Sequence, residues 1–179
     1  MRIWRVVAAL SVMQAAHADT GVDDLTLSRS FELRATVVRG CLLGTGSADV
    51  SSFGTLNFGQ FGSLPNDVQA SSSEGAGTIV LHCTPGTAVT VALNAGMHSS
   101  DIAGGRYLGK GAERLRYQLY QDASNSTVWG TAGVGGNALS IIFGAAGIQR
   151  YPVYARLFNA DPMPSAGIYS DTVTVTISY

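Results

Sequence analysis

Along several stretches of this chain apolar and polar residues alternate one by one, and this pattern restricts the possible folds more than any other feature. In residues 169–179 the odd positions Val173, Val175, Ile177 and Tyr179 form an apolar series, while serines and threonines occupy the even positions. Successive side chains of a β-strand point to opposite faces, so a period of two predicts a strand with one buried face. Similar alternation occurs in shorter stretches, at residues 31–37, 79–83, 89–93, 114–119 and 153–157.

Glycine, serine, asparagine and proline separate these stretches, and no window of useful length shows the helical period. Short alternating strands spaced by turn residues are typical of a β-sandwich. The serine-rich residues 62–77 are expected to form one long surface loop between strands. The sequence therefore predicts an all-β fold.

The first residues have the three parts of an export signal. Arg2 and Arg5 provide positive charge, residues 6–12 form a short apolar core, and Ala16-His17-Ala18 is the small-x-small pattern before a cleavage site. The apolar run is shorter than a bilayer span requires. We expect residues 1–18 to be a signal peptide, with a single mature domain beginning at Asp19.

Two cysteines, Cys41 and Cys83, are the only ones in the chain. In an exported protein two cysteines are expected to form one disulfide, and the alternative is a pair of buried free thiols. The chain has no C-x-x-C motif, and His82 should point to the sheet face opposite Cys83. These residues therefore predict a disulfide and no metal site.

Composition and motifs also exclude several classes of function. Charged residues make up 13% of the chain, the net charge is −1, and no Lys/Arg cluster occurs, which argues against a nucleic-acid partner. Residues 104–110 match most of a phosphate-binding loop, but Gly111 follows where a Ser or Thr should bind magnesium, so a hairpin turn is expected. His82 and His98 lie in no recognisable triad or metal spacing. We therefore expect no catalytic residue and no cofactor, and a protein that is not an enzyme.

A set of short sequence blocks follows one another in a recognisable order. The blocks are Gly40-Cys41, residues 53–59, residues 79–84, Gly86-Thr87, residues 115–122, Trp129-Gly130, residues 153–156 and residues 167–179. In this order they resemble the spore coat protein U domain family, which includes pilin subunits of archaic (Csu-type) chaperone–usher pili. Each block alone is weakly specific, whereas the ordered set covers nearly the whole mature chain.

The resemblance implies an immunoglobulin-like β-sandwich that lacks its last strand. It implies a donor-strand segment at residues 19–40 and a pilin domain at residues 41–179. The donor strand would use the alternating residues Leu27, Phe31, Leu33, Ala35 and Val37, with Arg29 among them. The strand bordering the open groove would use Val173, Val175, Ile177 and Tyr179. An ordinary first strand of a complete sandwich is the alternative for the N-terminal segment.

The function implied is that of a structural pilus subunit that polymerises by donor-strand complementation for surface attachment and biofilm formation. Its partners would be a periplasmic chaperone, an outer-membrane usher and neighbouring subunits, and it would pass through the periplasm to the cell surface. One alternative is a secreted spore-coat-type protein of a protective layer. Another is a small carbohydrate-binding module, with an aromatic platform drawn from Tyr107, Tyr120 and Trp129.

Overall fold

The computed structural model describes residues 27–132, 137–145 and 147–179, so the expected signal peptide lies outside the described residues. The described chain contains β-strands and no helix, and hence no helix able to cross a membrane. The described residues 27–36 belong to a separate unit from residues 37–179, and every strand that the structure describes lies in the latter. The all-β prediction is confirmed.

The strands are short, as the spacing of turn residues predicts. In chain order they are β1 (Cys41–Leu43), β2 (Val68–Ser71), β3 (Ile79–Cys83), β4 (Ala88–Leu93), β5 (Arg106–Lys110), β6 (Glu113–Tyr120), β7 (Leu139–Ile142), β8 (Gln149–Tyr151), β9 (Tyr154–Leu157) and β10 (Val175–Ser178).

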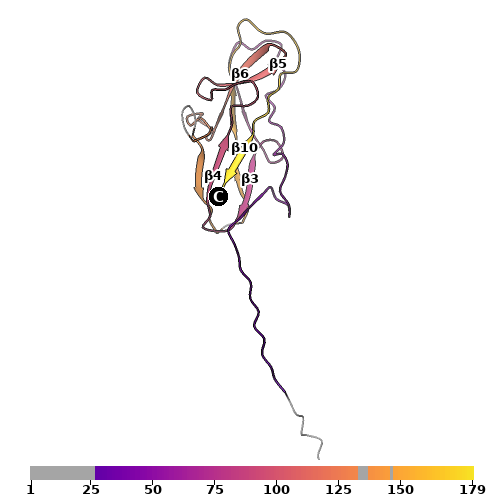
Figure 1. Ribbon diagram of the computed structural model, residues 1–179. Helices are drawn as coiled ribbons and strands as arrows, with labels where there is room; N and C mark the ends of the chain where they lie inside the picture. The colour runs from indigo at the N-terminus through magenta and orange to yellow at the C-terminus, as the bar shows by residue number, and fades with distance from the viewer. Residues whose placement is uncertain (1–26, 133–136, 146) are drawn as a thin grey trace, which may run out of the picture. The chain divides into compact units, whose positions relative to one another are not determined.

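These strands form three sheets in a sandwich-like arrangement, in the orders β1-β3-β8, β10-β4-β7 and β2-β9-β6-β5. Every pair of strands is antiparallel, and β10, the last strand, lies beside β4 (Figure 1). The neighbours β5 and β6 are joined by a tight turn in which Lys110 pairs with Glu113. The hairpin turn expected at Gly111, in place of a phosphate-binding loop, is therefore present.

The core is built from the inward side of the central strands. In β4 the alternation places Val89, Val91 and Leu93 inside, each at most 2% exposed. In β3 Leu81 and Cys83 are buried while His82 between them is exposed, as the period of two requires. The remaining buried apolar side chains include Ile79, Leu115, Tyr117, Leu119, Trp129, Phe143, Ala155 and Leu157.

Three local expectations differ from the structure. Residues 62–77 are not one loop, because they contain β2, which pairs with β9. Residues 31–37 form no strand despite their alternation, and the C-terminal strand extends over Val175–Ser178 and not over all of residues 169–179. Alternation marks a capacity to form a strand, but a strand also needs a neighbour with which to hydrogen bond.

One charged side chain lies inside the sandwich. Arg106 of β5 is fully buried, and its Nε donates to the carbonyl of Asn94 over 2.8 Å. Its Nη2 donates to the carbonyls of Leu93 and Trp129, over 3.2 and 2.8 Å, and its Nη1 donates to the side-chain oxygen of Gln118. Burial lowers the pKa of Arg106, but a guanidinium still remains protonated. The hydrogen bonds therefore satisfy a permanent buried charge.

Candidate functional site

The free edge of β10 is the first component of the site. Within the described part of residues 37–179, β10 pairs with β4 on one side and with no strand on the other. An edge strand of this kind presents backbone N–H and C=O groups that can pair with another strand. Only serine and threonine alternate with its apolar residues, and these leave the backbone accessible.

The apolar face of β10 is incompletely covered. Val175 and Ile177 lie opposite Leu93 and Val91 of β4 and pack on the core, yet both remain half-buried while their β4 partners are enclosed. Val173 precedes the strand and is also half-buried against the core. Of the expected groove-edge residues, Tyr179 alone is exposed, at 65%, and lies just beyond the end of the strand.

A second incompletely covered edge occurs at the start of the domain. β1 is the outer strand of the sheet β1-β3-β8, and its Leu43 is half-buried against the core. Phe53, Leu56 and Phe58, in the segment that follows, are half-buried against the same core. Both ends of the domain sequence thus contribute apolar side chains that are only partly enclosed.

Tyr117 of β6 connects these two regions. Its ring lies 6.2 Å from that of Phe58 in an edge-on arrangement, and its hydroxyl donates to Oδ2 of Asp171 over 2.6 Å. Burial, together with this hydrogen bond, raises the pKa of the Tyr117 phenol. The segment after β1 and the segment leading into β10 therefore meet at one buried side chain.

Asp171 is a site residue that sequence reasoning did not identify. Besides Tyr117, it accepts from the backbone N–H of Met97 over 2.7 Å and from that of Thr172 over 2.9 Å. These bonds hold the approach to β10 against the loop that follows β4. A signal was present, because Asp171 is the one carboxylate on the otherwise apolar odd face of residues 169–179.

The N-terminal segment has the features of an unpaired strand. Residues 27–36 lie outside the unit formed by residues 37–179 and contain no strand. Leu27, Phe31 and Leu33 are 71%, 83% and 83% exposed, and Ala35 is exposed as well. On the even positions Arg34 donates to both carboxylate oxygens of Glu32, over 2.7 and 2.9 Å. Val37, the first residue of the second unit, is 83% exposed.

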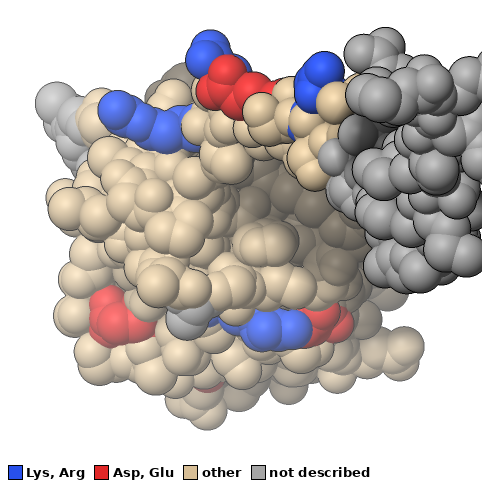
Figure 2. All heavy atoms as spheres, turned by 90° about the horizontal axis from the view of Figure 1, so that it is seen from below, with Lys and Arg blue, Asp and Glu red and all other residues tan. Residues whose placement is uncertain are grey.

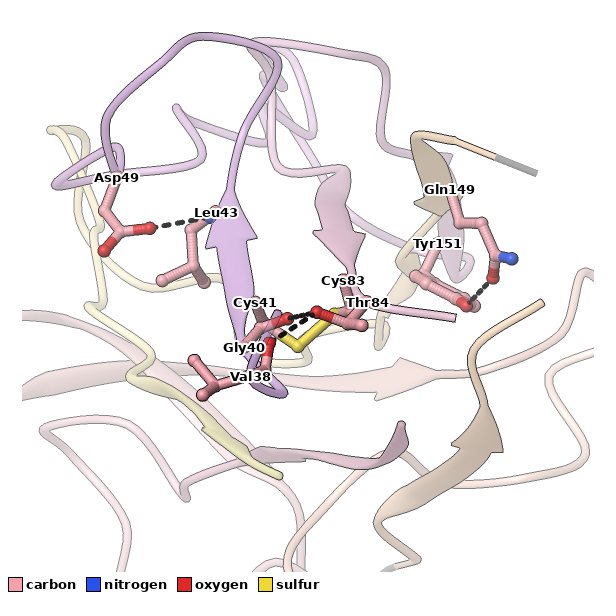
Figure 3. The surroundings of a disulfide bond; sticks show 9 residues. All are labelled: Val38, Gly40, Cys41, Leu43, Asp49, Cys83, Thr84, Gln149 and Tyr151. Atoms are coloured by element: carbon pink, nitrogen blue, oxygen red, sulfur yellow. Dashed lines mark hydrogen bonds between the residues drawn. A yellow bond between two sulfur atoms is a disulfide. The ribbon is translucent and has the colours of Figure 1, made fainter. Parts of the chain in front are cut away.

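The expected disulfide is present in the second unit, soon after its first residues. Cys41 of β1 and Cys83 of β3 are direct cross-strand partners with Cα atoms 4.0 Å apart, and their sulfur atoms are bonded. Figure 3 shows Thr84 beside the disulfide, with its hydroxyl directed at the carbonyls of Val38 and Gly40, 3.3 and 3.4 Å away. The backbone N–H of Thr84 also donates to Gly40 over 2.9 Å. The disulfide and these bonds fix where the chain enters β1.

Two of the aromatic residues considered for a carbohydrate platform are inside the protein. Trp129 is 1% exposed and its indole N–H donates to the carbonyl of Val91 over 3.0 Å, and Tyr120 is 7% exposed. Tyr107 is half-buried. A platform that uses Trp129 or Tyr120 is therefore wrong for this fold.

One face of the molecule is poor in charge. Figure 2 shows this face, on which most of the described surface is uncharged. No group of three metal-ligating side chains occurs among the described residues. The arrangement supports strand pairing and apolar burial as its chemistry.

Comparisons with known proteins agree with this fold. The family model described as the Spore Coat Protein U domain matches residues 27–176. A search of solved structures found similarity to the CsuC–CsuE chaperone–tip adhesion subunit pre-assembly complex from archaic chaperone–usher Csu pili of Acinetobacter baumannii, at 24% identity and a TM-score of 0.50. The match covers 80% of this chain and 40% of that chain, so this chain spans less than half of that relative. Among curated proteins no match was found.

Proposed function

Since the chain belongs to the Spore Coat Protein U domain family, we propose that it is a structural subunit of an archaic chaperone–usher pilus. The observation that carries the proposal is the free edge of β10, whose apolar face is half-buried beside an enclosed β4. The family is a structural one and not a family of enzymes. The similar solved structure contains a chaperone bound to a pilus subunit, which supports a periplasmic chaperone as the first partner.

Polymerisation follows from pairing the two unpaired elements in different molecules. Residues 27–37 of one subunit add as a strand to the β10 edge of the next, with main-chain hydrogen bonds and apolar side chains both contributing. Leu27, Phe31, Leu33, Ala35 and Val37 face the core of the acceptor. Each junction is head-to-tail and does not close on itself, so a filament grows.

The apolar donor residues contribute most of the binding free energy. Phe31 and Leu33 are each 83% exposed, and burying such a side chain stabilises the complex by about 1.5–3 kcal/mol. Glu32 and Arg34 lie on the opposite side and stay paired in solvent. A slip of one residue would bring those two charges into the core, so the odd register is strongly preferred.

The route to the surface begins with the signal peptide at residues 1–18. After export, the chaperone covers the β10 edge, the outer-membrane usher catalyses exchange for the donor strand of the next subunit, and the fibre serves surface attachment and biofilm formation. An uncovered edge strand with a partly exposed core promotes aggregation, which explains the need for a chaperone.

A peptide spanning residues 25–38 tests the proposal directly. It should raise the melting temperature of a chain lacking residues 1–40, because a ligand that binds only the folded form stabilises that form. At a peptide concentration of about a hundred times Kd, the free energy of unfolding should rise by about 2.7 kcal/mol. A peptide with Phe31→Asp should have no effect, while one with Glu32→Gln should act like the natural sequence. If no peptide shifts the melting temperature, the sandwich is complete and the protein is a free-standing secreted domain.

The same two substitutions, made in the full chain, test assembly. The Phe31→Asp chain should fold with its chaperone and remain monomeric, whereas the Glu32→Gln chain should form fibres. Fibres of normal length from Phe31→Asp, seen by electron microscopy, would refute donor-strand polymerisation.

A protective spore-coat layer is the second candidate, and the family description is the observation that favours it. Both candidates use the same edge, but only a pilus requires a dedicated chaperone and usher. Secretion of stable protein by a strain without those two genes would favour the coat layer.

A further inference from the structure

A second surface of the domain combines free positive charge with aromatic rings. It is the outer face of the sheet β2-β9-β6-β5. The alternation of β6 directs Leu115 and Tyr117 into the core, so Arg114 and Arg116 point outward and are exposed. Tyr107 of β5 is the direct cross-strand partner of Arg116 and shares its face.

Arg116 is held in one orientation. Its guanidinium carbon lies 4.1 Å from the ring centre of Phe158, a cation–π contact. Its stem packs on Gly105, where a built Cβ would lie 3.3 Å from the Cγ of Arg116. The backbone N–H of Phe158 donates to the carbonyl of Arg116 over 2.9 Å. The planar cation is therefore positioned before any partner arrives, which lowers the entropy lost on binding.

Arg116 acts on the neighbouring acid Asp67 only through space, because that acid is already paired with another arginine. Arg156 lies 5.2 Å from the ring centre of the same Phe158, and it is paired with Asp67. A hydrogen bond from the backbone of Asn159, and then those from Arg156, lower the pKa of Asp67, so this acid is ionised and occupied. Within the described ranges neither Arg116 nor Arg114 has a carboxylate within ion-pair distance.

We propose that this face binds an acidic polysaccharide, with Arg116 pairing a uronate carboxylate and Tyr107 packing against a sugar ring. A fixed guanidinium matches a carboxylate with two parallel hydrogen bonds. The face offers two exposed arginines beside an aromatic ring, which favours a chain whose carboxylates are separated by neutral ring surface. The surface lies in a different sheet from β10, so this site goes beyond the proposed assembly and does not depend on it.

Binding of the mature chain to immobilised polygalacturonate, with neutral dextran as the reference polymer, tests the site. The chain should be retained on polygalacturonate at low salt, released at high salt, and not retained on dextran. Arg116→Gln should weaken binding by about tenfold or more, the loss expected for one charge-assisted pair. Arg150→Gln, which removes an exposed arginine from β8, should bind like the natural chain.

Two further variants separate ligand contact from folding. Arg114→Gln changes a side chain that bonds only to backbone carbonyls of Gly111 and Glu113, and it should weaken binding without changing the melting temperature. Tyr107→Ala should weaken binding at unchanged salt dependence, because it removes a ring and no charge. The proposal is overturned if the natural chain does not bind polygalacturonate, if duplex DNA binds more tightly, or if Arg114→Gln and Arg116→Gln bind undiminished.

Discussion

Replacing the buried Arg106 by methionine should remove a large part of the stability of the domain. Methionine fills much of the same space but donates no hydrogen bond. The carbonyls of Leu93, Asn94 and Trp129 would each lose their bond from the guanidinium. Gln118 would lose one as well, although its side-chain oxygen would still accept from the backbone N–H of Leu119 over 3.0 Å.

The magnitude follows from the three carbonyls. A buried acceptor left without a partner costs about 1–3 kcal/mol, so three such carbonyls together cost at least about 3 kcal/mol. We expect Arg106→Met to lower the free energy of unfolding by about 3–5 kcal/mol, a large share of the roughly 5–15 kcal/mol that a typical domain has. Arg106→Lys should lose less, because an ammonium can still donate to part of this set.

Urea unfolding followed by tryptophan fluorescence measures the effect. Trp129 is fully buried and its carbonyl accepts from Arg106, so its emission reports both the core and this network. Arg150→Met is the matched control, since Arg150 is exposed and makes a surface ion pair with Glu74 that is worth at most about 1 kcal/mol. If Arg106→Met unfolds within 1 kcal/mol of the natural chain, as Arg150→Met should, the buried network does not stabilise the fold as argued.

Three further outcomes follow from other contacts. Changing both Cys41 and Cys83 to alanine should lower the free energy of unfolding by about 3–4 kcal/mol in the chain-entropy account, measured by urea unfolding against the natural chain with and without reductant. Hydrogen bonds from Ser165 and then Tyr169 lower the pKa of Glu113 to about 2, so its stabilising effect should be present above pH 4.5 and lost as the pH falls towards 2. Thermal unfolding of Glu113→Gln should lack that acid-dependent part. Tyr117→Phe should lower the free energy of unfolding by about 1.5–3 kcal/mol, because the carboxylate of Asp171 would lose the hydrogen bond from the phenol.

The alternation predicted the interior better than the boundaries. Leu81, Val91 and Leu119 were placed on inward faces and are buried, since burial on one side of a sheet produces the period of two. β2 was missed because its four residues, Val68–Ser71, lie in a serine-rich stretch with no apolar series. Its strand character comes from pairing with β9, a contact distant in sequence that local patterns do not encode.

The polar contacts of the interior were less predictable than its apolar residues. Nothing in the sequence around Arg106 indicates that three backbone carbonyls surround it, because the acceptors come from separate segments of the chain. Cys41 and Cys83 were easier, since two cysteines allow one disulfide at most, and the structure contains it in place of the two free thiols that were the alternative. A contact can be predicted from the sequence when a residue type has few possible partners, as with two cysteines. It cannot be predicted when any backbone carbonyl can accept the hydrogen bond, as with an arginine.

The expected strand at residues 31–37 is the most informative difference. Its alternation is as regular as that of β4, yet it forms no strand, and its Phe31 and Leu33 are exposed. An exposed apolar series of this kind is what the donor strand proposed above would offer to a neighbouring molecule. β10 lacks a second neighbouring strand among the described residues, and its Val175 and Ile177 are only half-buried. A subunit that polymerises needs an apolar segment without a partner strand in its own molecule and a sheet edge that can accept such a segment from another copy. Residues 31–37 and β10 have these two properties.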